Sequence, residues 1–133
     1  DLVRSRGLGD VYKRQGEELP KVSPDTPMNQ VLYEISNKRL GLTTIVDEQD
    51  HLLGIFTDGD LRRLIDKQQG FDVKLPVSAV MIEHPATISQ EARAVEALQQ
   101  LNAKKISQFV VVDDQNKVIG VISMHDLIQA GVN

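Results

Sequence analysis

Two short stretches of this chain carry the residue types that could do chemistry. Both follow the pattern Gly-x-x-Thr/Ser-x-x-Asp: Gly54, Thr57 and Asp60 in the first stretch, and Gly120, Ser123 and Asp126 in the second. Each stretch ends an apolar run, so each should lie where a strand leads into a helix. A hydroxyl and the free backbone amides of a helix start can hold a phosphate, and a carboxylate three residues on can accept both hydrogen bonds of a ribose diol. These residue types would therefore suit a phosphate or ribose site.

A capping box would use the same residues. In that motif a Thr or Ser before the helix and an acidic residue at its third position satisfy each other's backbone amides. Asp is a poorer partner than Glu or Gln there, so its presence in both stretches favours the ligand site over a cap alone. For Ser123 and Asp126 the two readings remain open.

The residues that follow each pattern differ between the two stretches. Arg62 and Arg63 follow the first, and Ile128 and Gln129 take their places in the second. An arginine on the first turn of a helix could clamp a phosphate, and the helix dipole gives it no other reason to be there. A solvated surface pair is the alternative for at least one of the two. We expect the first stretch to bind better than the second.

Asp58 and His125, which lie inside the two stretches, complete the candidate ligand-binding set. Asp58 and Asp60 could suggest paired catalytic carboxylates, but no histidine or nucleophile arrangement accompanies them. The three histidines of the chain do not have the spacing of a metal site. We therefore assign no catalytic residue, no metal and no cofactor.

An internal repeat contains both stretches. Residues 45–61 align with residues 111–127 without a gap, at a constant offset of 66 positions that places Gly54 on Gly120. The same offset relates two upstream sets of apolar residues with the i, i+3, i+4, i+7 spacing of an amphipathic helix: Met28, Val31, Leu32 and Ile35, and then Ala94, Ala97, Leu98 and Leu101.

Each repeat should therefore run helix, strand, strand, helix. The predicted strands are 44–46 and 52–57 in the first repeat, and 110–112 and 118–123 in the second. The closing helices should bury Leu61, Leu64 and Ile65 in the first, and Leu127 and Ala130 in the second. Residues 70–76 have the glycine, proline and polar content of a linker.

The fold class that follows is α+β, with two repeats related by a pseudo-twofold that pack together because neither has much core alone. We place the first domain at residues 16–72 and the second at 73–133. Residues 1–15 are basic and carry no periodicity that continues into the repeat. We interpret them as an unstructured or foreign segment that contributes nothing to the fold.

The composition excludes several classes of function. The chain has 133 residues, 41% of them hydrophobic, with a net charge of −4 and a pI near 5.3. This charge argues against nucleic acid as a partner. No apolar run approaches the length of a membrane span, and the absence of cysteine suits a reducing compartment. We expect a cytoplasmic protein with no membrane or nucleic-acid partner.

With "GIFTDGDLRR" (54–63) and "MHDLIQAGV" (124–132), the repeat resembles a tandem pair of CBS domains, a Bateman module, over residues 16–133. It is similar to the C-terminal regulatory region of the arabinose 5-phosphate isomerase family, whose members carry a sugar-isomerase (SIS) domain first. Ser123 stands where that family often has histidine, and it follows the general CBS pattern. The resemblance implies an adenosine nucleotide as ligand, or a cytidine sugar nucleotide if the end product of the pathway feeds back.

The resemblance also implies what the chain does. We expect a ligand-sensing, homo-oligomerising regulatory module of a sugar-phosphate isomerase that supplies arabinose 5-phosphate towards Kdo. Catalysis belongs to the SIS domain in that family, so this chain should not catalyse by itself. The alternatives are a purely structural dimerisation module without ligand, and a stand-alone CBS regulatory protein.

Overall fold

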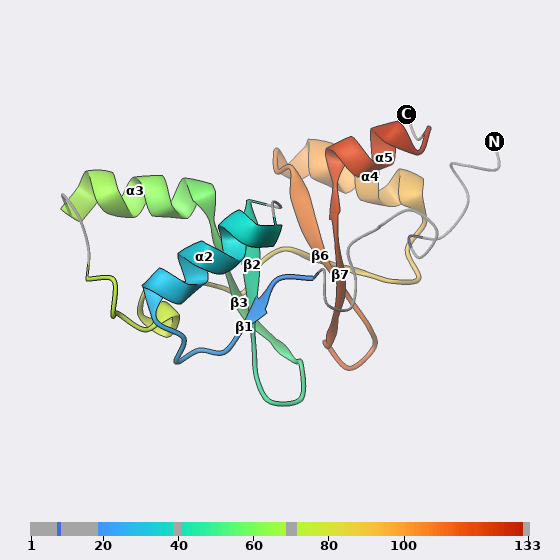
Figure 1. Cartoon of the computed structure of the whole chain (residues 1–133). Helices are drawn as coiled ribbons and strands as arrows, with labels where there is room; N and C mark the ends of the chain where they lie inside the picture. Colours follow the sequence, from blue (N-terminus) through green and yellow to red (C-terminus); the bar gives the residue numbers. More distant parts are fainter. Residues whose placement is uncertain (1–7, 9–18, 39–40, 69–71, 132–133) are drawn as a thin grey trace. The chain divides into compact units, whose positions relative to one another are not determined.

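The computed structural model describes residues 8, 19–38, 41–68 and 72–131, and the chain divides into two compact units. The first unit comprises residues 17–85, and the second comprises residues 86–133 together with 1–16. Each unit combines a small sheet with helices (Figure 1). The predicted α+β class is confirmed, while the pseudo-twofold between the repeats stays a prediction.

The first unit is built on a four-stranded sheet in the order β1-β2-β3-β4. Strand β1 (Lys21–Val22) pairs in parallel with β2 (Leu42–Val46), which pairs antiparallel with β3 (Leu52–Thr57), and β4 (Ile82–Glu83) pairs antiparallel with β3. The helices are α2 (Met28–Lys38) and α3 (Asp58–Gln68), with a short 3₁₀ helix η3 (Val77–Ala79). Helix α2 contacts β2, and α3 continues directly from β3.

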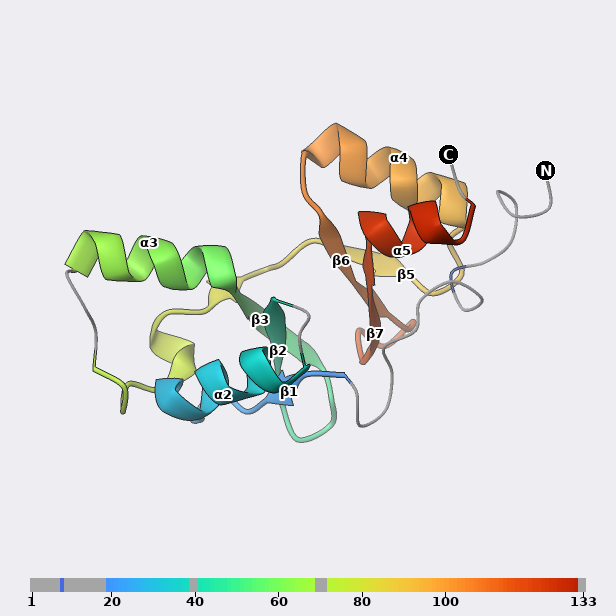
Figure 2. The ribbon, with the colours of Figure 1, turned by 45° about the horizontal axis from the view of Figure 1, so that its top comes forward.

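The second unit repeats this order on a three-stranded sheet, β5-β6-β7. Strand β5 (Thr87–Ser89) is parallel to β6 (Gln108–Val112), and β6 forms an antiparallel hairpin with β7 (Val118–Ser123). Helices α4 (Ala94–Lys104) and α5 (Met124–Gln129) pack against each other beside this sheet (Figure 2).

The two hairpins agree in detail, which confirms the sequence repeat. Leu42 lies opposite Thr57 in the first hairpin, and Gln108 lies opposite Ser123 in the second. Each hairpin has a register shift at the end of its first strand, between Ile45 and Val46 and between Val111 and Val112. Each turn also has one left-handed residue, Asp50 with φ 67° and Asn116 with φ 64°. Strands β3 and β7 have the predicted bounds, whereas β2 and β6 each begin two residues earlier than predicted.

Each unit has its own hydrophobic core, to which the predicted helix faces and the hairpin strands both contribute. In the first unit the buried members are Met28, Val31, Ile35, Ile45, Phe56 and Val77. In the second they are Leu8, Ile88, Ala94, Ala97, Leu101, Phe109, Val111, Ile122 and Leu127. The predicted burial of Ile65 is wrong, because Leu61 and Leu64 pack on the core and Ile65, about 100° further round α3, is 44% exposed.

The strands β1, β4 and β5 were not predicted. They are two or three residues long, too short to show the alternation of apolar and polar residues that identifies a strand in sequence. Two of them form by pairing with strands that are distant in sequence: β1 lies parallel to β2, and β5 lies parallel to β6.

The segment expected to be a linker is packed structure where it is described, from residue 72 onwards. The first two amides of α2, those of Met28 and Asn29, donate to the carbonyls of Leu75 and Val73, both at 2.9 Å. These contacts satisfy amides that a helix start leaves without an internal partner. Val77 is fully buried in the same unit. The first unit therefore extends to Pro85, past the repeat boundary placed after residue 72.

Leu8 is the described member of residues 1–15, and it is fully buried in the core of the second unit. Its backbone N–H donates to the carbonyl of Ala92 at 3.2 Å. The prediction that this segment contributes nothing to the fold is therefore wrong at Leu8; its remaining residues lie outside the described part of the chain. One leucine without periodic apolar neighbours gives no signal in the sequence.

No helix among the described residues is long and apolar enough to cross a membrane.

Candidate ligand-binding site

The junction between β3 and α3 brings Thr57 and Asp60 together. Thr57 is the last residue of β3, and the Asp60 backbone N–H donates to its Oγ1 at 3.1 Å. In return the Thr57 backbone N–H donates to Asp60 Oδ2 at 2.9 Å. This reciprocal pair is a capping box, so the cap is present. A hydroxyl that accepts one hydrogen bond can still donate, and a carboxylate oxygen has a second lone pair, so the same two groups can also meet a ligand.

Arg63 joins this pair from the next turn of α3. Its Nη2 donates to Asp60 Oδ1 at 2.6 Å, across a pair in which the arginine side chain is 73% exposed and the carboxylate 9%. Both oxygens of Asp60 are therefore engaged, one by the backbone of Thr57 and the other by a cation. Arg62 is exposed on the same helix.

Asp58 lies on the other side of the helix start, beside Gly41. Its backbone N–H donates to the Gly41 carbonyl at 2.9 Å. Gly41 has φ +73°, and a Cβ there would lie 3.2 Å from Asp58 Oδ2. Two of the first three amides of α3, those of Asp58 and Asp60, are thus already bonded within the protein. The expectation that the hydroxyl and the free amides of the helix start would hold a phosphate is weakened, and the arginines become the stronger candidates for that contact.

The second junction, between β7 and α5, repeats the arrangement. Ser123 Oγ accepts from the Asp126 N–H at 3.0 Å, and Asp126 Oδ2 accepts from the Ser123 N–H at 3.0 Å. The Met124 N–H donates to the Ser107 carbonyl at 2.9 Å, as Asp58 does to Gly41. His125 is exposed on the first turn of α5. The position of Arg63 is taken by Gln129, which has no charge.

The two motif glycines lie within strands rather than beside the carboxylates. Gly54 and Gly120 are both buried, in β3 and β7. At Gly54 a Cβ would lie 2.8 Å from the Ile82 carbonyl oxygen and 2.9 Å from Met81 Sδ. The close approach of β4 therefore accounts for a glycine at this position, and its contact with a ligand stays a prediction.

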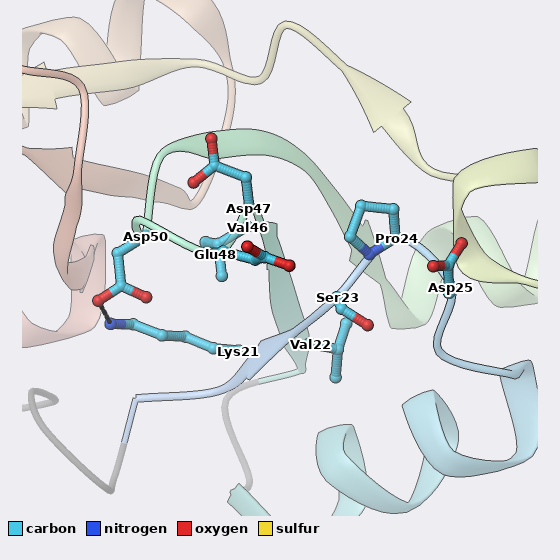
Figure 3. A pocket seen from close by; sticks show the side chains of 9 residues that line it. All are labelled: Lys21, Val22, Ser23, Pro24, Asp25, Val46, Asp47, Glu48 and Asp50. Atoms are coloured by element: carbon cyan, nitrogen blue, oxygen red, sulfur yellow. Dashed lines mark hydrogen bonds and ion pairs between the residues drawn. The ribbon is translucent and has the colours of Figure 1, made fainter.

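A pocket of about 490 Å³ opens at the opposite end of the first sheet. It lies where β1 and β2 end, whereas Thr57 pairs with the first residue of β2. Lys21 Nζ and Asp50 Oδ2 form an ion pair at 3.2 Å along its wall (Figure 3). The remaining lining residues are Val22, Ser23, Pro24, Asp25, Val46, Asp47 and Glu48. None of them was predicted as a site residue, and nothing in their spacing marks them in the sequence.

Asp47, at the rim of this pocket, organises the β2–β3 turn. Partial burial acts to raise the pKa of its carboxyl, but hydrogen bonds from the backbone of His51 and Gln49, and from the His51 side chain, outweigh it and hold that pKa below 3.8. Its Oδ1 accepts from both backbone amides at 2.9 Å, and its Oδ2 lies 3.1 Å from His51 Nδ1. These contacts make Asp47 a structural residue of the turn. Among the described residues, no group of three or more His, Cys, Asp or Glu side chains is placed to hold a metal ion.

The repeated junction, a hydroxyl and a carboxylate after the second strand of each hairpin, can be compared with known proteins. The sequence profile of the CBS domain matches residues 9–67 and again residues 77–133. The chain belongs to the CBS domain family. The duplicated hairpin and the capping pair at each junction are thus features of two CBS domains in tandem.

Curated relatives of this CBS pair include arabinose 5-phosphate isomerases. The KdsD enzyme of Pseudomonas aeruginosa is 44% identical over 118 residues, which is 88% of this chain and 36% of the enzyme. The chain therefore spans about a third of the length of that relative.

Solved structures of other CBS pairs share the fold. CBSX2 in complex with AMP superposes with a TM-score of 0.81 at 23% identity, over 94% of this chain and 95% of that one. The CBS pair of MJ0100, in complex with 5′-methylthioadenosine and S-adenosyl-L-methionine, superposes with a TM-score of 0.80 at 18% identity, over 94% of each chain.

Proposed function

We propose that this CBS pair is the regulatory module of an arabinose 5-phosphate isomerase and that it binds a nucleotide at the starts of α3 and α5. The observation that carries the proposal is the hydroxyl–carboxylate pair built twice in the same way, Thr57 with Asp60 and Ser123 with Asp126. The relationship to KdsD supports the parent enzyme, and the AMP complex of CBSX2 supports the class of ligand.

In the proposed complex each residue type has one role. The carboxylate of Asp60 or Asp126 accepts from the ribose diol, and the neighbouring hydroxyl donates to ribose or phosphate. At the first site Arg62 and Arg63 supply the charge for the phosphate, because the amides of Asp58 and Asp60 are bonded within the protein. The ligand is an adenosine nucleotide or a cytidine sugar nucleotide.

In this proposal the CBS pair is one part of a longer enzyme. Isomerisation of the sugar phosphate belongs to a SIS domain elsewhere in the full-length enzyme, which acts in the cytoplasm, and the CBS pair joins copies of that enzyme into a homo-oligomer. Single apolar side chains are exposed in each unit, Tyr33 and Ile65 in the first and Ile128 in the second, and each could be covered on association.

A thermal-shift screen of nucleotides and sugar nucleotides tests the ligand. A ligand that binds only the folded protein stabilises it by about 2.7 kcal/mol at a hundredfold excess over its Kd, so AMP or a cytidine sugar nucleotide should raise the melting temperature. Sedimentation at micromolar concentration should show at least a dimer. Association without any ligand response would favour the structural dimerisation module instead.

A further inference from the structure

The side chain of Arg63 occupies the site that the ribose would use. Its Nη2 lies 2.6 Å from Asp60 Oδ1, while the backbone of Thr57 holds Asp60 Oδ2 at 2.9 Å. The carboxylate that would receive a ribose diol is thus already bonded within the protein at both of its oxygens. A ribose can reach Asp60 Oδ1 in the same geometry only after the arginine has left it.

The guanidinium reaches back across the first turn of α3, over Gly59. A Cβ built on Gly59 would lie 3.4 Å from both Nη1 and Nη2 of Arg63, and 3.6 Å from Thr57 Oγ1. The absence of a side chain at residue 59 therefore leaves room for the guanidinium beside this turn. A cation over the N-terminal turn opposes the helix dipole, so Asp60 is the contact that holds it there.

This contact is weak enough to exchange. The Asp60 carboxylate is only 9% exposed, but the Arg63 side chain is 73% exposed, so water screens the arginine end of the pair and limits what it contributes. A ligand phosphate offers the guanidinium a bidentate partner in place of Asp60. A nucleoside without phosphate must displace Arg63 and gives it no new partner.

The second CBS domain lacks this arrangement. Gln129 stands at the position of Arg63, and Ile128 at that of Arg62. Asp126 keeps the contact of its Oδ2 with the Ser123 N–H at 3.0 Å. A neutral amide replaces the cation at residue 129, so a nucleoside meets no charged competitor there.

We propose that Arg63 is an internal competitor for Asp60 that makes the first site selective for phosphorylated ligands, whereas the second site also accepts nucleosides without phosphate. The inference rests on the proposed nucleotide site and adds its ligand selectivity. On this proposal a phosphorylated ligand draws Arg63 away from Asp60 by offering the guanidinium its phosphate instead.

Reciprocal substitutions test this by titration calorimetry with AMP and adenosine. Asp126→Ala serves as the background in which the first site is measured, and Asp60→Ala as the background for the second. In the first background, Arg63→Gln should raise adenosine affinity by up to about fivefold, the range that an exposed ion pair allows, and should lower AMP affinity. In the second background, Gln129→Arg should lower adenosine affinity.

The dependence of ligand affinity on salt concentration distinguishes a competitor from a merely structural residue, because a structural role for Arg63 would not change it. Screening weakens the Asp60–Arg63 pair, so adenosine should bind the first site more tightly as salt increases, while AMP should bind less tightly. Arg63→Gln should remove the rise for adenosine. Melting temperatures of all variants, measured without ligand, identify any that fail to fold.

The outcomes separate this inference from the proposed function. If AMP binds but Arg63→Gln leaves both adenosine affinity and its salt dependence unchanged, Arg63 is not a competitor and the inference is overturned. If folded protein binds neither AMP, adenosine nor a cytidine sugar nucleotide in any variant, the nucleotide site itself is wrong and the inference falls with it.

Discussion

Ser123 supports a helix that is too short to be stable alone. Helix α5 has six residues, and isolated helices of that length do not persist in water. Ser123 Oγ accepts from the Asp126 N–H at 3.0 Å, so Ser123→Ala should lower the free energy of unfolding by about 1 kcal/mol, measured by urea denaturation. The same substitution at exposed Ser78 is the control. Equal stability of both variants would contradict the assigned cap.

Asp47 makes the stability of the first unit depend on pH in acid. Its pKa in the folded protein lies below 3.8 because the carboxylate accepts from the amides of His51 and Gln49. A lowered folded pKa stabilises the protein above the unfolded pKa, and this contribution is lost as the pH falls through the folded value. Asp47→Asn, which keeps an oxygen acceptor in the turn, should therefore lose less stability than the wild type below about pH 4. Parallel denaturation curves across that range would argue against the assignment.

At the scale of elements, the approach of β4 to β3 depends on the absence of a side chain at Gly54. A Cβ there would lie 2.8 Å from the Ile82 carbonyl oxygen, so Gly54→Ala should destabilise by about 1–3 kcal/mol. Gly59→Ala is a control of opposite sign, because its Cβ would meet the flexible Arg63 side chain and the Thr57 hydroxyl no closer than 3.4 Å, and alanine favours a helix by up to about 1 kcal/mol. A neutral Gly54→Ala variant in calorimetry would show that β4 does not depend on this contact.

Leu8 attaches the N-terminal segment to the core of the second unit. Its side chain is fully buried among residues of that core, and truncation of a buried leucine to alanine typically costs about 2–5 kcal/mol. We expect Leu8→Ala to lower the urea midpoint, whereas Leu53→Ala, at a leucine 36% exposed, should change it little. If both substitutions changed the urea midpoint by the same small amount, Leu8 would not anchor the segment to the core.

The sequence predicts those elements in which apolar residues recur at a regular spacing over several turns of helix or several strand positions. The faces of α2 and α4 and the strands β3 and β7 follow directly from apolar spacing and the 66-residue repeat. Strands β1 and β5 are formed by pairing with a hairpin distant in sequence, so no local pattern marks them. The segment from residue 72 has the composition of a linker, yet it completes the hydrogen bonds at the start of α2, which only the fold brings near.

The candidate site was predictable in its residue types and less so in its contacts. Thr57 and Asp60 lie three residues apart at a helix start, and that spacing alone brings them together. Arg63 was expected to face a phosphate, but it bonds to Asp60, because i,i+3 neighbours on a helix are close enough to pair. The pocket at the ends of β1 and β2 joins residues about 25 positions apart and has no sequence signal.

At the scale of the whole molecule, the two CBS domains share the same fold but differ in charge at the helix starts where a ligand is proposed to bind. Each has a hydroxyl and a carboxylate at the end of its hairpin, and only the first adds arginines. The function proposed here, sensing of a nucleotide by a module of a larger isomerase, depends on these two junctions binding a ligand.

Titration calorimetry of the chain with AMP and with a cytidine sugar nucleotide measures that dependence most directly, alongside Asp60→Ala, Asp126→Ala and the double variant. We expect the wild-type chain to show saturable binding of at least one of these two compounds. Each single substitution should remove one carboxylate acceptor, whose hydrogen bonds are worth roughly 1.5–3 kcal/mol, or about 10-fold to 150-fold in affinity at its own site. Retention of wild-type affinity by a folded double variant, or no binding by the wild type, would contradict the account.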